Sequence, residues 1–170
     1  MFARSEILQL FDNQSEYGKK YTFGPLTNEM IERAEKTVGF KLPKSYVDLL
    51  KLQNGGLINF NNAWLTIIYG ISPEPNAYNG LEKEYKHYIE DWQYPRDIGI
   101  PFGQTQSAGE DLYYFDCRNL DLNNEPSIVR VDIETEEIYK VADNFKSFIN
   151  MILNKFEISE TLIGKFKIVD

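Results

Sequence analysis

Residues 26–56 read LTNEMIERAEKTVGFKLPKSYVDLLKLQNGG and contain the start and stop signals of two short helices. Thr27 is a residue type that caps helix N-termini, and Gly39 lies where a helix commonly ends in a left-handed glycine. Pro43 suits the first turn of a second helix, which the run NGG at 54–56 then ends. The connection between the helices is short. We therefore expect an αα-hairpin whose joined apolar faces need a sheet to cover them.

The same segment carries the motifs of a known family. The sequence GFKLP at 39–43 is followed by a helix that ends in QNGG at 53–56, which is an uncommon combination. In these motifs the chain resembles the SUKH superfamily, which includes the Smi/Knr-type cell-wall assembly regulators and many bacterial immunity proteins. From residue 57 to residue 153 the resemblance is one of pattern only. The residues that match the signature, and that the resemblance implies to be structural, are Gly39, Phe40, Leu42, Pro43, Tyr46, Asn54, Gly55 and Gly56.

The rest of the chain alternates strand patterns with helices and turn-rich loops. One helix is expected at 81–92, and another, capped by Asp143, carries an apolar stripe from Phe145 to Phe156. Strands grouped between helices, without regular βαβ alternation, predict an α+β fold. The helical hairpin and the C-terminal helix would pack on a largely antiparallel or mixed sheet of about six strands. These strands are expected at 57–60, 63–69, 98–102, 112–117, 129–133 and 138–141.

The length of 170 residues is that of one domain. The resemblance implies a SUKH-like domain over 26–156, with an N-terminal extension over 1–25 and a C-terminal extension over 157–170 that packs on the same domain. Phe166 and Ile168 in the latter permit one last strand or a segment that pairs with a neighbouring chain. The chain opens with neither a basic segment nor a long apolar run, and it has one cysteine. We therefore expect a cytoplasmic protein, and leave its oligomeric state open.

The net charge of −8 is concentrated in the middle of the chain. Residues 72–143 carry 16 Asp and Glu against 6 Lys and Arg, whereas residues 1–71 and 144–170 each carry a net charge of +1. A protein that binds the phosphate backbone needs the opposite sign, so nucleic acid is not expected as a direct ligand. A basic protein partner fits better, although acidic loops also serve simply to keep a protein soluble.

The sequence contains none of the common phosphate-loop, dinucleotide, zinc-protease or serine-hydrolase motifs. His87 is the only histidine and Cys117 the only cysteine, so a zinc site with two histidines is excluded. A weak metal site of His87 with Glu84 or Asp91 is less favoured than an exposed charge pair on a helix. A Cys117–His87 dyad is less favoured than a small buried side chain at the end of an apolar strand. We therefore expect no cofactor, no metal and no catalytic residue.

Acidic and aromatic residues are the candidates for contact with a partner. Two acidic pairs fall in predicted hairpin turns, where acids are common but where they would also accept Lys and Arg from a partner. Aromatic side chains dominate binding hot spots, so Trp64, Tyr78, Trp92 and Tyr94 are possible anchors, although each is more often a core residue, above all those that follow helix or strand periodicity. The candidate partner surface comprises Tyr78, Trp92, Tyr94, Glu110, Asp111, Glu136 and Glu137.

These observations predict a non-catalytic protein-binding module. The resemblance implies a bacterial immunity protein that binds and neutralises a cognate toxin, and the acidic middle of the chain suggests a basic toxin such as a nuclease. One alternative is a regulatory scaffold of the Smi/Knr type, which would be expected to carry long disordered extensions. Another is a small hydrolase or metal enzyme that uses His87, Cys117 or the acidic loops.

Overall fold

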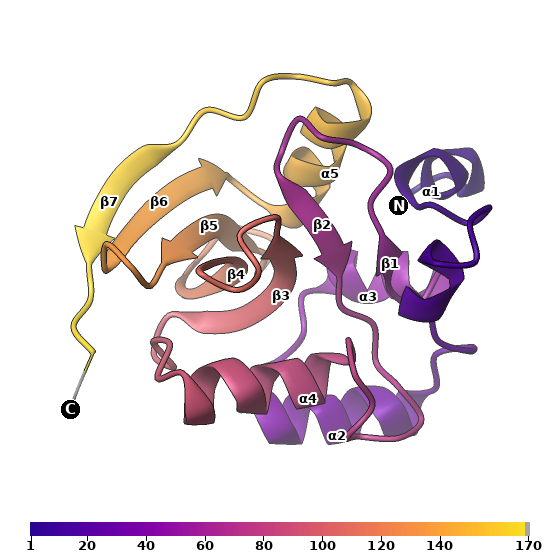
Figure 1. Ribbon diagram of the computed structural model, residues 1–170, viewed down its shortest axis with the longest axis horizontal. Helices are drawn as coiled ribbons and strands as arrows, with labels where there is room; N and C mark the ends of the chain where they lie inside the picture. Colours follow the sequence, from indigo (N-terminus) through magenta and orange to yellow (C-terminus); the bar gives the residue numbers. More distant parts are fainter. Residues whose placement is uncertain (169–170) are drawn as a thin grey trace.

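The computed structural model describes residues 1–168 and contains a single antiparallel sheet in which strands adjacent in sequence are adjacent in space (Figure 1). The fold is α+β, as predicted, with seven strands rather than six. β1 and β7 form the two edges of this sheet. The strands are β1 (Gly56–Leu57), β2 (Leu65–Ile68), β3 (Gly99–Thr105), β4 (Asp111–Leu120), β5 (Pro126–Asp132), β6 (Glu137–Ala142) and β7 (Thr161–Lys165).

The helices are short and pack on the two faces of the sheet. In Figure 1, α2 and α4 lie side by side, while α5 lies on the other side of the strands. Within residues 1–168, no helix is long and apolar enough to cross a lipid bilayer. The helical segments are α1 (Arg4–Leu10), η1 (Gly18–Tyr21), α2 (Asn28–Val38), α3 (Lys44–Leu52), α4 (Leu81–Lys86), the π-helical turn η2 (His87–Asp91) and α5 (Phe145–Leu153).

Both helices of the predicted hairpin are present, although α2 packs beside α4 and α3 packs beside α1 and α5. The side chain of Thr27 accepts a hydrogen bond from the Met30 backbone N–H at 3.3 Å, which caps α2. Gly39 ends α2 with a φ of +79°, a conformation that favours glycine. Pro43 directly precedes α3, whose Tyr46 is fully buried. The two helices therefore form where local signals predict them, and Tyr46 anchors α3 in the core.

The motif that follows α3 joins distant segments. The buried Asn54 side chain donates to the carbonyls of Gly24 at 3.0 Å and Ile71 at 2.8 Å, and its oxygen accepts from the Ile71 N–H at 2.8 Å. Gly55 has a φ of +82°, and a Cβ there would lie 2.5 Å from the backbone nitrogen of Gly70. This part of the motif therefore holds the chain before α2 and the chain after β2 against the end of α3.

The sheet has an aromatic layer on each face, because side chains along a strand alternate. On one face, Phe115 of β4 packs against Tyr46 of α3 and Phe145 of α5, with ring centroids 5.1 and 5.4 Å apart. On the other face, Tyr114 stacks on Tyr94, which follows η2, at 6.3 Å. β4 is thus buried from both sides and forms the centre of the core.

Several predicted boundaries differ from the structure, and three of them lie in the C-terminal part of the chain. The N-cap of α5 is Asn144, whose side chain accepts from the Ser147 N–H at 2.9 Å, rather than Asp143. α5 ends at Leu153, so Phe156 lies beyond the apolar stripe and is exposed. The last strand, β7, ends at Lys165 before the predicted position, because its backbone pairs with β6 from residue 161 onward.

The segment before α2 is part of the same packed structure. Phe2, Ile7, Leu10 and Phe11 are buried, and the Phe2 ring makes an edge contact with Phe145 of α5 at 6.2 Å. Phe11 also forms a single β-bridge with the chain after β1. At the other terminus β7 pairs with β6, as described above. The N-terminal segment therefore contributes to the core, whereas β7 joins the sheet by backbone pairing and leaves Leu162 and Ile163 exposed.

Candidate functional site

Three segments far apart in the sequence meet at one end of the sheet. Gly109, in the β3–β4 turn, lies against the aromatic side chains near the end of η2: a Cβ placed on it would be 3.1 Å from the Tyr88 ring and 3.3 Å from the Trp92 ring. The neighbouring Glu110 accepts a hydrogen bond through its carbonyl from the Ile133 N–H, at the start of the β5–β6 turn, at 2.9 Å. These contacts place η2 and both turns side by side.

The Asp, Glu, Lys and Arg side chains of these three segments are all acids, and the exposed Trp92 follows η2. We call this surface the acidic end. Its acids are exposed or half-buried, and all come from the highly charged middle of the chain. Its members are Glu90, Asp91, Trp92, Glu110, Glu134 and Glu136.

Trp92 is held in a fixed orientation although 40% of its surface is exposed. Its ring makes an edge contact with Tyr88 at 5.7 Å and a tilted contact with His87 at 5.4 Å. The His87 ring in turn lies 3.3 Å from the Asp91 carboxylate. A preorganised aromatic side chain loses little conformational entropy on binding, so Trp92 is suited to anchor a partner.

In each predicted acidic pair, one member is bound within the protein. Asp111 accepts hydrogen bonds from Thr105 and from Ser107 at 2.6 Å, whereas Glu110 is exposed. Glu137 accepts from the Tyr139 hydroxyl and pairs with Lys165 at 3.2 Å, and these two contacts lower its pKa. Of the other two acids, Glu110 is exposed and Glu136 is half-buried.

The two remaining predicted aromatic contacts lie elsewhere. Tyr94 is only 2% exposed, and its hydroxyl donates to the Gly109 carbonyl at 2.6 Å. Burial raises the pKa of this hydroxyl well above its ordinary value. Tyr94 is thus buried under the β3–β4 turn and is not part of the partner surface. Tyr78 is 81% exposed but precedes α4, so it lies toward the other end of that helix from Trp92.

A groove adjoins the acidic end on the face that carries α5. It has a volume of about 770 Å³ and lies between the β1–β2 connection and the connection from α5 to β7. Trp64 at its edge is 66% exposed, contrary to the expectation that it is a core residue. The Trp64 carbonyl accepts from the Gln106 N–H of the β3–β4 turn at 3.1 Å, which joins the groove to the acidic end.

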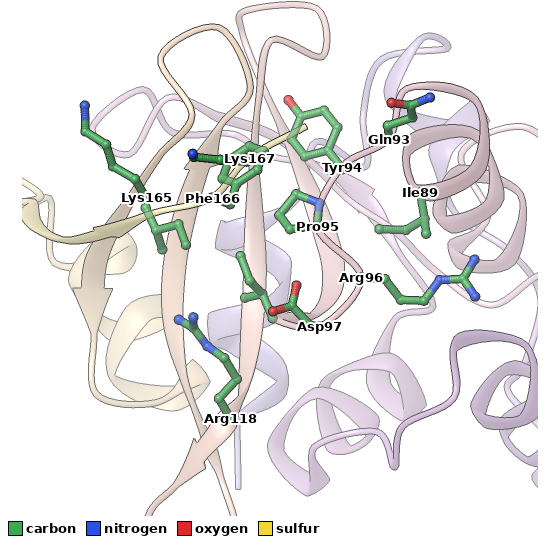
Figure 2. Close-up of a pocket in the computed structure, with 12 residues that line it drawn as sticks. Ile89, Gln93, Tyr94, Pro95, Arg96, Asp97, Arg118, Lys165, Phe166 and Lys167 are labelled. Carbon is green, nitrogen blue, oxygen red and sulfur yellow. The ribbon is translucent and has the colours of Figure 1, made fainter. Parts of the chain in front are cut away.

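A second hollow, of about 480 Å³, lies between the segment 93–98 and the end of β7 (Figure 2). It is lined by several cations, which is unusual in this acidic chain. Figure 2 shows that Arg96 extends away from Lys165 and Lys167. Arg118 is paired with the buried Asp116 at 2.8 Å. The cations therefore do not converge on one point where an anion would bind.

The residues considered for catalysis have separate bonding partners. The Cys117 thiol donates to the Phe115 carbonyl at 3.6 Å, and burial raises its pKa to about 11. The His87 ring has Asp91 as its partner. Within residues 1–168, no group of three or more His, Cys, Asp or Glu side chains is arranged to hold a metal ion. Cys117 and His87 therefore bond to different groups, and the Cys117 thiol donates to a backbone carbonyl rather than to a base.

The fold and the site together define an α+β protein whose surface is suited to holding another macromolecule. The chain belongs to the SMI1 / KNR4 family (SUKH-1), whose family model matches residues 25–151. The predicted membership of the SUKH superfamily is thereby confirmed. No curated protein matches the chain. Membership of this family is consistent with a protein partner.

Proposed function

We propose that this protein is a non-catalytic immunity protein that binds a basic toxin domain and covers its active site. The observation that carries the proposal is the acidic end. Five acids lie on η2 and on two hairpin turns, and the exposed tryptophan that follows η2 contacts the first of these turns. An aromatic anchor within a charged rim is the arrangement that protein interfaces use for affinity and for partner choice.

The charge of this surface suggests the chemistry of the partner. Residues 72–143 have a net charge of −10, and the acids of the acidic end belong to this region. A surface of one sign accelerates association with a partner of the opposite sign and disfavours other partners. Nuclease domains, which bind nucleic acid, present the basic surface that this arrangement would complement. The proposal places the protein in the cytoplasm, where such a toxin would act.

Charge reversal tests the proposal directly. The probe is a toxin-like domain encoded next to the gene of this protein, and binding is measured by titration calorimetry at low and high salt. We expect Glu110→Lys, Glu134→Lys and Glu136→Lys together to weaken binding by at least about tenfold at low salt. The salt dependence of binding should also become shallower, because fewer charge pairs form.

A matched variant controls for net charge. Glu16→Lys, Glu32→Lys and Glu74→Lys reverse three exposed acids outside the acidic end and should change affinity by less than about threefold. Trp92→Ala should weaken binding by about tenfold or more in a protein that remains folded by circular dichroism. Equal effects of the two triple variants, or no effect of either, would refute the assignment of this surface.

A further inference from the structure

Hydrogen bonds from one side chain hold together two segments of the chain beside the Trp64 groove. Asn62, in the β1–β2 connection, donates to the Met151 carbonyl at 3.3 Å and to the Phe156 carbonyl at 2.9 Å. These bonds join the two chain segments that line the groove. The opposite lining comes from β4 and β5, through Asp111 and Arg130. The groove is therefore present without a ligand and needs no rearrangement to admit one.

The charges in the groove do not balance. Arg130 donates two hydrogen bonds of 2.7 Å to Glu160 and one of 2.9 Å to Asp111, and it lies 3.5 Å from Asp132. One guanidinium thus faces three carboxylates, and each of the four side chains is less than a third exposed. Partial burial strengthens charge interactions, so the excess negative charge favours the entry of a second cation.

Burial opposes the charged form of Arg130, but its hydrogen bonds to Glu160 and the attraction of Glu160 and Asp111 raise its pKa. Arg130 therefore stays charged. The remaining charges at the edge, Lys155 and Glu157, are exposed and of opposite sign. The net charge of the side chains that line the groove is therefore still negative.

Trp64 provides an aromatic surface at the edge of this groove. Its ring is two-thirds exposed, and its backbone φ is +54°, a conformation that disfavours a bulky side chain. An exposed indole beside carboxylates attracts a cation through its ring face. Arginine suits both features, because its planar guanidinium stacks on aromatic rings and binds carboxylates with paired hydrogen bonds.

We propose that the groove receives an arginine side chain of the basic partner, with its guanidinium on the Trp64 ring and its N–H groups toward Asp111 and Glu160. This inference rests on the proposed function, since it names a contact of the same partner. It also extends the binding surface from the acidic end onto the α5 face of the sheet.

The two tryptophans of the chain allow a direct test, because one lies at each surface. The Trp92→Phe variant leaves Trp64 as the sole reporter of the groove, and its fluorescence is titrated with N-acetyl-arginine amide at low salt. We expect a saturable change in emission, weaker binding of N-acetyl-lysine amide, and no saturation with N-acetyl-glutamine amide. The Trp64→Phe variant, in which Trp92 reports, should show no saturable change.

Two matched substitutions distinguish binding of arginine in the groove from binding at the acidic end. Glu160→Gln in the Trp92→Phe background should weaken arginine amide binding by about tenfold, the effect of losing one charged hydrogen bond. Glu134→Gln in the same background should change the affinity for the arginine amide by less than about twofold, because the Glu134 carboxylate does not line the groove. No response of Trp64, an equal response to the glutamine compound, or equal effects of the two substitutions would overturn the inference.

The outcome is distinguishable from that of the proposed function. If Trp64 does not respond to arginine while charge reversal at the acidic end still weakens binding of the toxin-like domain, the groove assignment fails and the proposed function stands. If Trp64 responds to arginine but the toxin-like domain does not bind, the groove binds guanidinium and the proposed partner is wrong.

Discussion

At the scale of single residues, a buried amide contributes more to this fold than its position at a helix end suggests. The motif at 53–56 was interpreted from sequence as a stop signal. In the structure, Asn54 is 3% exposed and makes three hydrogen bonds to backbone groups of Gly24 and Ile71. A buried backbone group without a partner costs about 1–3 kcal/mol.

Asn54→Ala should therefore lower the free energy of unfolding by about 2–4 kcal/mol, because the Ile71 N–H and two carbonyls lose their partner. The measurement is urea denaturation followed by tryptophan fluorescence. Asn123→Ala, in the exposed β4–β5 turn, serves as the control and should change stability by less than about 0.5 kcal/mol. A similar small loss for both variants would show that the Asn54 side chain is not structurally important.

The raised pKa of Cys117 predicts an unreactive thiol. Its pKa of about 11, against an ordinary 9.0, lowers the thiolate fraction at pH 8 by about a hundredfold. Alkylation by iodoacetamide, followed by mass spectrometry, should be slower by about that factor in the folded protein than in guanidinium. A rate equal to that of the unfolded chain would reopen the role of Cys117 as a nucleophile.

The same shift has a defined effect on stability. Because the pKa of the thiol is raised in the folded state, the unfolded chain loses its proton first as pH rises. The contribution of Cys117 to stability is therefore complete below pH 9 and is lost as pH rises toward 11. A Cys117→Ser variant should show a smaller loss of stability over this range in denaturation experiments.

At the scale of elements, one ion pair joins the two helices on the α4 side of the sheet. Arg33 of α2 binds the carboxylate of Glu82 in α4 through two nitrogens, at 3.0 and 2.7 Å, and its guanidinium also donates to the carbonyls of Ser72 and Pro73. Glu82 is 2% exposed. Arg33 thus fixes both the start of α4 and the loop that leads to it.

Arg33→Met should lower stability by about 3–5 kcal/mol, because it leaves a buried carboxylate without its partner. The double variant Arg33→Met/Glu82→Leu should be more stable than the Arg33 single variant, since the uncompensated charge is gone. Lys44→Met, which breaks the exposed pair with Asp48, should cost less than about 1 kcal/mol. If the double variant were the least stable in urea denaturation, the ion pair would not be the dominant interaction.

Local signals explain which elements could be predicted. The boundaries of α2 follow from Thr27 and Gly39, whose effects act within one helical turn. The end of α5 was predicted too far along, because Phe156 has the right spacing but lies after the last helical turn. Spacing alone does not show whether an apolar residue has anything to pack against.

The site depended on long-range contacts and was predicted only in part. Of the residues predicted for the partner surface, Trp92 and Glu110 are exposed and Glu136 is half-buried, and their role in binding stays a prediction. Their meeting at one surface depends on strand register, which no local pattern reports. Tyr94 was misplaced for the same reason: the β3–β4 turn that covers it is distant in the sequence.

At the scale of the whole molecule, charge and shape divide the surface into different regions. The acidic end and the Trp64 groove adjoin through the hydrogen bond from Gln106 to Trp64. α2, with Arg33 and Lys36, lies on the α4 side and carries charges of both signs. A basic partner would therefore approach the sheet from the end that carries the β3–β4 and β5–β6 turns.

Hydrogen exchange with and without the toxin-like domain encoded beside the gene tests this account most directly. The account predicts slower exchange on binding in residues 90–92, 106–110 and 133–136, with the Trp64 loop as the adjoining region, and no change in α2. Slower exchange confined to α1 or α2, with none in the two turns, would contradict it.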